Sequence, residues 1–416
     1  SPRWNQMVHA MISASGSGSE RAAMKFLGTG GHHQMTRDIA LLFLGMDLEC
    51  ARCHDHPSVK TWEQADYWGL YAYLSWTKPA TSSKDKKEYL VEVLGKKEIE
   101  YQSVFESVSD ATGPQLPGLP EKKVPELAKG EEFSSPAADG LPPVPKFLPR
   151  KELAADLTSP KNHAFARNSV NRFWARLMGR GLIHPLDQIH PGNPPSHPEL
   201  LKKMAELFIS RDYDLKWLLR SILLSKAYQR SSRLPGNKAP VDPQSYRTAL
   251  PKALTPEQLL HSVLRATGNL EKTRTLKSDP AKKFDRKGYF TGTHQDLPES
   301  YEEIRAIFIQ TFGQPPGEPE TEFTPGLNQS LFLMNDRLLL SWLQPAGNNL
   351  IKRLGDLKTA TEISKVLYLE VLSRSPGEIE TAELDDYLKK NSARRSAALG
   401  ELAWALINST EFRLNH

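Results

Sequence analysis

Residues 43–62, FLGMDLECARCHDHPSVKTW, contain both cysteines of the chain, Cys50 and Cys53, and His54 directly follows the second. In a C-x-x-C-H motif the two thiols add across the vinyl groups of haem, and the adjacent histidine reaches the iron. In a chain with only two cysteines this spacing is rare by chance. The motif therefore predicts haem c, held covalently by Cys50 and Cys53, with His54 as the proximal ligand of the haem iron.

Two other interpretations of the motif stay open. Zinc would take Cys50, Cys53 and two of His54, His56 or a distant histidine, because zinc accepts thiolate and imidazole ligands in a tetrahedron. The chain has no second pair of ligands at the usual spacing, however, and His54 is crowded against Cys53 for binding one ion. A disulfide or redox pair normally follows a strand at a helix N-terminus, whereas here a predicted helix leads into the motif.

The sixth ligand of the haem iron is less defined by the sequence. His33 and His32 lie in residues 28–38, GTGGHHQMTRD, just before the predicted helix that delivers Cys50, and we consider His33 ahead of His32. Met35 and Met46 are softer alternatives. An open sixth position is the other alternative.

Other residues near the motif are assigned supporting or structural roles. His56 lies two residues after His54, too close to cross to the opposite face of a porphyrin, so we expect it to contact the ligands or the propionates. Polar residues that crowd one later loop suggest a second metal site, but the many prolines there favour a rigid turn: His184, Asp187, His190 and His197. An aromatic surface is interpreted as core that could also pack on a haem edge: Trp62, Tyr67, Trp68 and Tyr71.

Hydrophobic periodicity predicts a mainly α fold with a small helical haem domain. Helices are predicted over residues 1–15, over 36–50 with Thr36 as the N-cap, and over 61–76. From Glu88 to Val108 the pattern alternates, and Gly95-Lys96 occupies the place of a turn, which predicts a short β-hairpin.

Residues 110–148 are rich in proline, glycine, serine and lysine and predict a linker between domains. The chain is therefore divided into a cytochrome c-like haem domain at 1–109, the linker at 110–148, and a larger all-helical domain with long Pro-rich loops at 149–416. Helices are predicted at 150–160 and 163–182, the second stopped by Gly179 and Gly181, and Ser196 is predicted to cap the helix that begins near Pro198.

Composition limits the classes of partner. The 416 residues are 39% hydrophobic and 25% charged, which is ordinary for a globular protein. The formal charge of +5 comes from 54 basic and 49 acidic side chains and predicts no nucleic-acid partner. With no apolar run of about 18 residues, no transmembrane segment is predicted. Because Ser1-Pro2-Arg3-Trp4 enters a helical pattern at once, we interpret residue 1 as a processed or trimmed end.

Several long stretches resemble a known family. Residues 37–75 look like the C-terminal half of the planctomycete cytochrome c-like domain, and residues 168–201, 213–232 and 404–416 look like the domain of unknown function that usually follows it. The resemblance implies an exported protein whose first domain begins midway. It therefore also implies that an N-terminal segment of the same precursor, or another chain, packs on the first helices. Where relatives commonly have an acidic-aromatic-Arg run, this chain has Asp187-Gln188-Ile189-His190.

We expect an exported c-type haem protein that acts in electron transfer with a redox partner protein, or as a haem-dependent oxidoreductase. Two axial protein ligands favour electron transfer, whereas one ligand and an open face favour oxidation or peroxide chemistry. Covalent haem attachment occurs outside the cytoplasm, which places the protein in the periplasm or at the cell surface. The alternative is a structural or interaction protein of the cell envelope, in which the motif binds haem or metal for stability.

Overall fold

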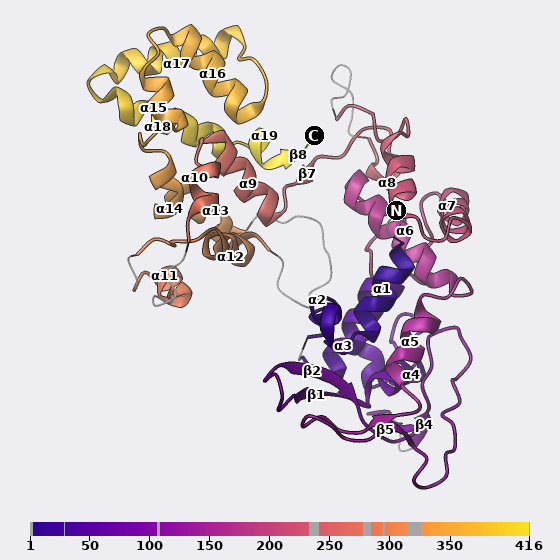
Figure 1. Cartoon of the computed structure of the whole chain (residues 1–416). Helices are drawn as coiled ribbons and strands as arrows, with labels where there is room; N and C mark the ends of the chain where they lie inside the picture. The colour runs from indigo at the N-terminus through magenta and orange to yellow at the C-terminus, as the bar shows by residue number, and fades with distance from the viewer. Residues whose placement is uncertain are drawn as a thin grey trace. The chain divides into compact units, whose positions relative to one another are not determined.

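A computed structural model of the chain describes residues 3–28, 30–105, 109–232, 241–277, 284–293, 296–313 and 326–415. Two compact units are present, one comprising Ser1–Leu250 and the other beginning at Pro251 (Figure 1). Both are built mainly of helices joined by loops and small antiparallel hairpins, which confirms the predicted fold class. None of the described helices is both long and apolar enough to cross a membrane.

The helices of the first unit come from sequence both before and after the predicted linker. They are α1 (Trp4–Ser13), α2 (Arg21–Met24), α3 (Gly31–Ile39), α4 (Gln64–Leu74), α5 (Pro149–Leu157), α6 (His163–Met178), α7 (Pro198–Ser210) and α8 (Leu215–Leu223). In space α1 packs on α5, α3 on α4 and α6 on α7. One hydrophobic core joins them, with Ile12, Leu44 and Trp62 from before the linker and Phe165 and Phe208 from after it.

The compact units divide between Leu250 and Pro251, and residues 110–148 supply Leu116 to the first core. The domain boundaries proposed from the sequence stay a prediction.

The predicted helix at 36–50 is replaced by two shorter pieces. Helix α3 ends at Ile39 and continues as one π-helical turn, η2 (Ala40–Leu44), which stops at Gly45 in the left-handed region with φ 70°. Thr36 lies inside α3, where its hydroxyl donates to the carbonyl of His32 at 2.8 Å, so the prediction of an N-cap was wrong. An added Cβ at Gly45 would lie 2.5 Å from Ile189 Cδ1, so this position has no room for a larger residue. The positive φ, which glycine adopts readily, ends the helix there.

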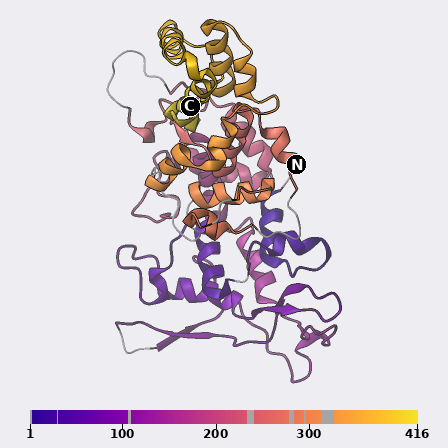
Figure 2. The same cartoon turned by 90° about the vertical axis from the view of Figure 1, so that its left-hand side faces the viewer.

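The predicted hairpin across Gly95-Lys96 was wrong in its pairing. Strand β2 (Glu88–Glu92) pairs back with β1 (Thr77–Thr81), and β3 (Ile99–Gln102) pairs forward with β4 (Ser109–Thr112). The segment between β2 and β3 packs on Trp76, whose indole N–H donates to the carbonyl of Lys96 at 2.9 Å. A further pair joins β5 (Phe133–Ser135) to β6 (Val144–Pro145). Strands β1 to β5 gather at one end of the first unit (Figure 2).

Two of the predicted helix boundaries after the linker hold. Helix α6 ends at Gly179 in the left-handed region, and α7 begins with Pro198 in its first turn. His197 rather than Ser196 is the N-cap of α7, and it makes no side-chain capping hydrogen bond, so the predicted cap was wrong. The hydroxyl of Ser196 lies 3.1 Å from His197 Nδ1.

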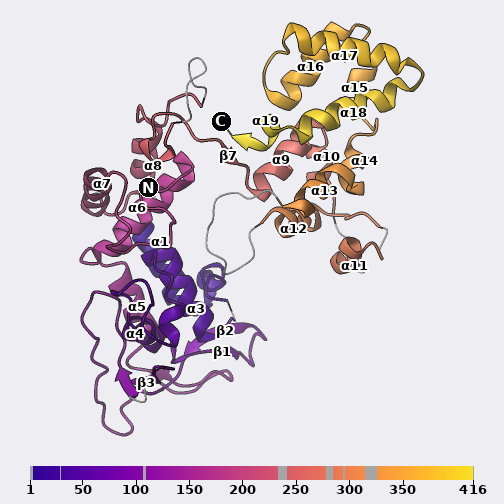
Figure 3. The ribbon, with the colours of Figure 1, turned by 180° about the vertical axis from the view of Figure 1, so that it is seen from behind.

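The second unit is a set of packed helices (Figure 3). They are α9 (Pro256–Ala266), α10 (Leu270–Thr275), α11 (Arg286–Thr291), α12 (Tyr301–Phe312), α13 (Leu327–Asn335), α14 (Arg337–Trp342), α15 (Leu350–Gly355), α16 (Ala360–Leu372), α17 (Glu378–Lys390), α18 (Arg395–Asn408) and α19 (Thr410–Arg413). A two-residue pair, β7 (Lys252–Ala253) with β8 (Leu414–Asn415), brings the end of this unit back to its beginning.

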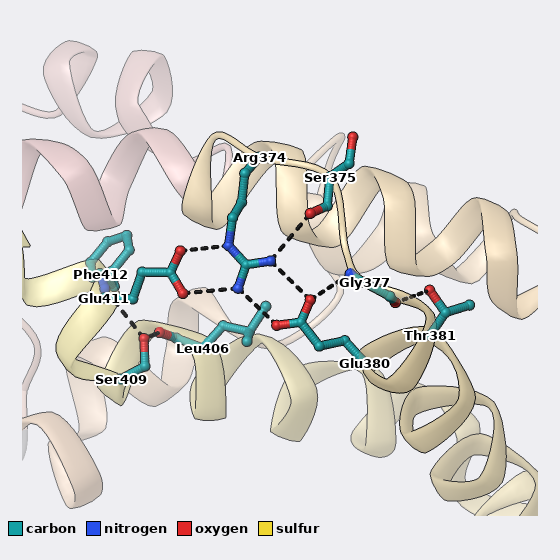
Figure 4. A network of polar contacts seen from close by, with 9 residues as sticks. All are labelled: Arg374, Ser375, Gly377, Glu380, Thr381, Leu406, Ser409, Glu411 and Phe412. Carbon is teal, nitrogen blue, oxygen red and sulfur yellow. Dashed lines mark hydrogen bonds and ion pairs between the residues drawn. The ribbon is translucent and has the colours of Figure 1, made fainter. Parts of the chain in front are cut away.

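A charged network holds the last helix of the second unit in place. The guanidinium of Arg374 donates to the carboxylates of Glu380 on α17 and Glu411 on α19, and lies between them (Figure 4). Hydrogen bonds from Arg374 and from the Gly377 N–H lower the pKa of Glu380 to about 2. The network therefore joins three segments by charge-assisted hydrogen bonds.

Candidate functional site

The two cysteines lie on one tight turn of the first unit. Cys50–Arg52 form a 3-10 turn, in which the N–H groups of Cys53 and His54 donate to the carbonyl of Cys50 at 3.2 and 3.4 Å. Both thiols are exposed, and neither is in a disulfide. The turn therefore presents two free thiols and an imidazole on one short segment, as covalent attachment of a flat group requires.

The tautomer of His54 follows from its hydrogen bond. Its Nδ1 lies 2.7 Å from the carbonyl of Asp55, and a carbonyl can only accept, so Nδ1 carries the proton. In the neutral ring Nε2 then holds a lone pair. A ligating histidine usually has this arrangement, with one nitrogen donating to the protein and the other free for a metal.

Apolar side chains lie open beside the thiols. The side chain of Phe105 is 78% exposed with its ring centroid 5.0 Å from that of His54, and Val104 is 65% exposed. The N–H of Val104 donates to the carbonyl of Cys53 at 3.0 Å, so these residues are held against the motif. Val104 and Phe105 therefore place apolar surface directly beside His54 and Cys53. The sequence did not identify Val104 and Phe105, because only the path of the chain after β3 brings them here.

The predicted aromatic surface is partly core and partly open. Trp62 and Tyr67 are buried, whereas Trp68 and Tyr71 are half-buried. The indole N–H of Trp68 donates to the carbonyl of Arg52, between the two cysteines, at 3.1 Å. Its ring also stacks on Tyr101 of β3 with 4° between the planes. The Trp68 ring is therefore fixed directly beside the C-x-x-C turn.

His33 and His32 point to different partners. The Nδ1 of His33 is 2.6 Å from the hydroxyl of Tyr67, while Nε2 of His32 is 2.6 Å from the carbonyl of Thr77 and must therefore donate to it. Burial lowers the pKa of His33, and the positive charge of Arg52 lowers it further. The His33 ring also meets the edge of Trp68 at 6.0 Å, and the indole N–H of Trp68 donates to the cysteine turn.

His56 is oriented by its own loop. Its Nδ1 accepts the N–H groups of Ser58 and Val59 at 3.2 and 3.0 Å, so Nε2 carries the proton in the neutral ring. The ring meets Trp62 edge to face at 5.1 Å, and His190 meets the same indole at 5.4 Å. Burial lowers the pKa of His56. In this tautomer Nε2 is protonated and Nδ1 is already occupied by two hydrogen bonds, so neither nitrogen offers iron a lone pair. The supporting role predicted for His56 stays a prediction.

The later histidine loop is tied to the segment that leads into the motif. The N–H of Asp47 donates to the carbonyl of Asp187, and the N–H of Ile189 donates to the carbonyl of Gly45. In the described parts of the chain no three His, Cys, Asp or Glu side chains are grouped so that they could hold a metal ion. Among these described residues, no such group therefore supports zinc at Cys50 and Cys53 or a second metal site in this loop.

Comparison with known protein families gives two matches. Residues 149–388 match a family described as a protein of unknown function, DUF1553, and residues 4–78 match another, DUF1549. Both are typical of planctomycete-type proteins, and no cytochrome c domain was identified. The predicted order, a first domain followed by a domain of unknown function, is thus confirmed only at the level of these two families. No curated protein and no solved structure matches the chain.

Proposed function

Since the chain belongs to the DUF1553 family, whose function is unknown, we propose from its site that it is an exported c-type haem protein that carries electrons or serves a haem-dependent oxidation. The observation that carries the proposal is the arrangement of Cys50, Cys53 and His54. Two free, exposed thiols stand three residues apart, and the next side chain keeps its Nε2 lone pair available.

The residues fit haem as a covalently held group. Each thiol would add its S–H across one vinyl C=C, so that sulfur bonds to one carbon and the hydrogen goes to the other, and no oxidant is needed. His54 would bind the iron through Nε2, with Asp55 holding Nδ1. When bound, haem supplies one-electron chemistry.

The surroundings suit a flat apolar group. Val104 and Phe105 offer open apolar surface beside His54, and Trp68 is held against the carbonyl of Arg52. These side chains would cover one edge of the group, and the extent of that burial would help to set its redox potential. Export to the periplasm or cell surface is part of the proposal, since covalent attachment takes place outside the cytoplasm.

The test is an absorption spectrum of the exported protein, oxidised and dithionite-reduced, followed by acid-acetone extraction. We expect sharp reduced bands that stay with the polypeptide. The double variant Cys50→Ala, Cys53→Ala should lose them, while Ser58→Ala, an exposed change in the same loop, should keep them. Haem that extracts into acetone, or a colourless protein, would contradict the proposal and favour a structural or interaction role in the cell envelope.

A further inference from the structure

A haem iron bound by His54 would have a second axial position on its opposite side. We infer that His33 is the ligand on that side and that Tyr67 is the residue that positions it. This inference rests on the proposed function, and it selects a six-coordinate electron carrier over an open, oxygen-reacting site.

The first step concerns the atom that His33 has to offer. Its Nδ1 lies 2.6 Å from the hydroxyl of Tyr67 and is thereby engaged with a buried side chain. A phenol can accept as well as donate, so Nδ1–H can donate to the Tyr67 oxygen. The hydrogen bond fits either tautomer of the neutral ring, and binding of iron at Nε2 would select the one in which Nδ1–H donates to Tyr67.

The second step concerns how firmly the ring is held. Three aromatic side chains of α4 surround it: the His33 ring lies 18° from the plane of Tyr67, meets Trp68 edge to face at 6.0 Å, and has its centroid 4.9 Å from that of Tyr71. Packing on one rigid helix fixes the direction of the imidazole better than a loop contact would.

The third step connects His33 to the cysteines. Trp68, which contacts the His33 ring, also donates its indole N–H to the carbonyl of Arg52. One side chain therefore links His33 to the middle of the C-x-x-C turn. The side chain of Arg52 also acts electrostatically on both His33 and Tyr67. His33 and the thiols thus belong to one neighbourhood on α3, α4 and the turn.

The competing ligands are engaged elsewhere. His32 donates from Nε2 to the carbonyl of Thr77. His56 accepts two N–H groups at Nδ1, which leaves its Nε2 protonated. Met35 is 3% exposed and is part of the hydrophobic core, and Met46 packs against the same core. Of these side chains, only His33 combines an anchored Nδ1 with contact to the residue that holds the cysteine turn.

The experiment uses the exported holoprotein and reads the spin state of haem by absorption and electron paramagnetic resonance. Wild type should be low-spin and should not bind carbon monoxide when reduced. His33→Ala should become high-spin and bind carbon monoxide, and added imidazole should restore the low-spin spectrum. His32→Ala is the matched control and should behave as wild type. Rescue by imidazole separates a ligand from a residue that only packs.

Tyr67→Phe tests the positioning role without removing the ring. We expect the low-spin spectrum to persist, while carbon monoxide displaces His33 about 10- to 100-fold more readily. Tyr71→Phe is the control, because the Tyr71 ring contacts His33 but no hydrogen bond joins the two side chains.

The outcomes separate the two proposals. A protein without covalent haem overturns the proposed function, and this inference with it. A covalent haem protein that is already high-spin, or that stays low-spin in His33→Ala, overturns the inference alone.

Discussion

Glu92 and Arg150 form an ion pair inside the first unit, with Arg150 Nε 4.0 Å from Glu92 Oε2 and both side chains no more than 3% exposed. The backbone N–H of Arg150 also donates to Glu92 Oε1 at 2.8 Å. The guanidinium donates to the carbonyls of Ile12, Ala14 and Leu90. Arg150 therefore joins the end of α1, strand β2 and helix α5.

Removing the Arg150 charge should strongly destabilise the first unit. Arg150→Met removes the guanidinium from Glu92 Oε2 and from three buried carbonyls, while the backbone N–H of residue 150 still donates to Glu92 Oε1. We expect a loss of about 3–5 kcal/mol in the free energy of unfolding. The measurement is a urea unfolding curve followed by tryptophan fluorescence. Arg176→Met, at an exposed arginine of α6, should change the midpoint little. Equal midpoints for the two variants would refute the role given to Arg150.

Gly45 should not accept a side chain. Its φ of 70° is strained for an L-residue, and a Cβ would meet both Ile189 and Asn168 Oδ1, the latter at 2.7 Å. We expect Gly45→Ala to cost about 2–5 kcal/mol, from backbone strain and overpacking together. Gly118→Ala is the matched control, since Gly118 has φ 76° but open space around its Cβ, and should cost only about 1–2 kcal/mol. Thermal unfolding of both variants compares the two effects, and equal losses would remove the packing argument.

The Arg374 network should lose its effect in acid. Because the pKa of Glu380 lies at about 2 in the folded protein and its usual value is 4.5, its stabilisation is present above about pH 4.5 and disappears as the pH falls toward 2. Glu380→Gln should therefore destabilise the second unit by about 1 kcal/mol near neutral pH and by much less at pH 3. Urea midpoints at the two pH values check this. Glu383→Gln, exposed on the same helix, is the control, and a loss independent of pH would contradict the assignment.

The thiols of Cys50 and Cys53 should report attachment directly. Both side chains are exposed, so protein made in a host that lacks haem attachment should react with iodoacetamide at both cysteines without denaturant. The exported holoprotein should react at neither, even when unfolded, because thioethers have no free S–H. Mass spectrometry of the labelled peptides gives the count. Free, reactive thiols in the exported protein would argue against covalent haem.

The sequence predicted those elements of the fold that depend on local patterns, and it missed those that depend on which segments or groups meet in space. Helix α1, the helical aromatic segment of α4 and the stop of α6 at Gly179 follow from local periodicity and one positive φ, and the sequence predicted them. The pairing of β2 was missed because its partner, Thr77–Thr81, has a weak strand pattern and lies before it. Ser196 was misassigned because its hydroxyl lies against the His197 ring rather than the N–H groups of α7.

The candidate site shows the same limit. Cys50, Cys53 and His54 were readable as a motif, because their chemistry depends on sequence spacing alone. The contact of Phe105 with His54 depends on the path of β3 past the motif, and the choice between His32 and His33 depends on which oxygen each ring reaches. No local pattern carries that information.

The shared core of the first unit determines which fragments of this protein can fold on their own. The two family matches stop at residue 78 and start at residue 149, yet Phe165, Phe208 and Leu218 pack in the same core as Ile12, Leu44 and Trp62. A fragment limited to either match would expose that apolar surface to water and to other copies of itself, and would aggregate. Fragments for expression should instead keep the first 250 residues together, so that the family boundaries do not become the ends of the fragment.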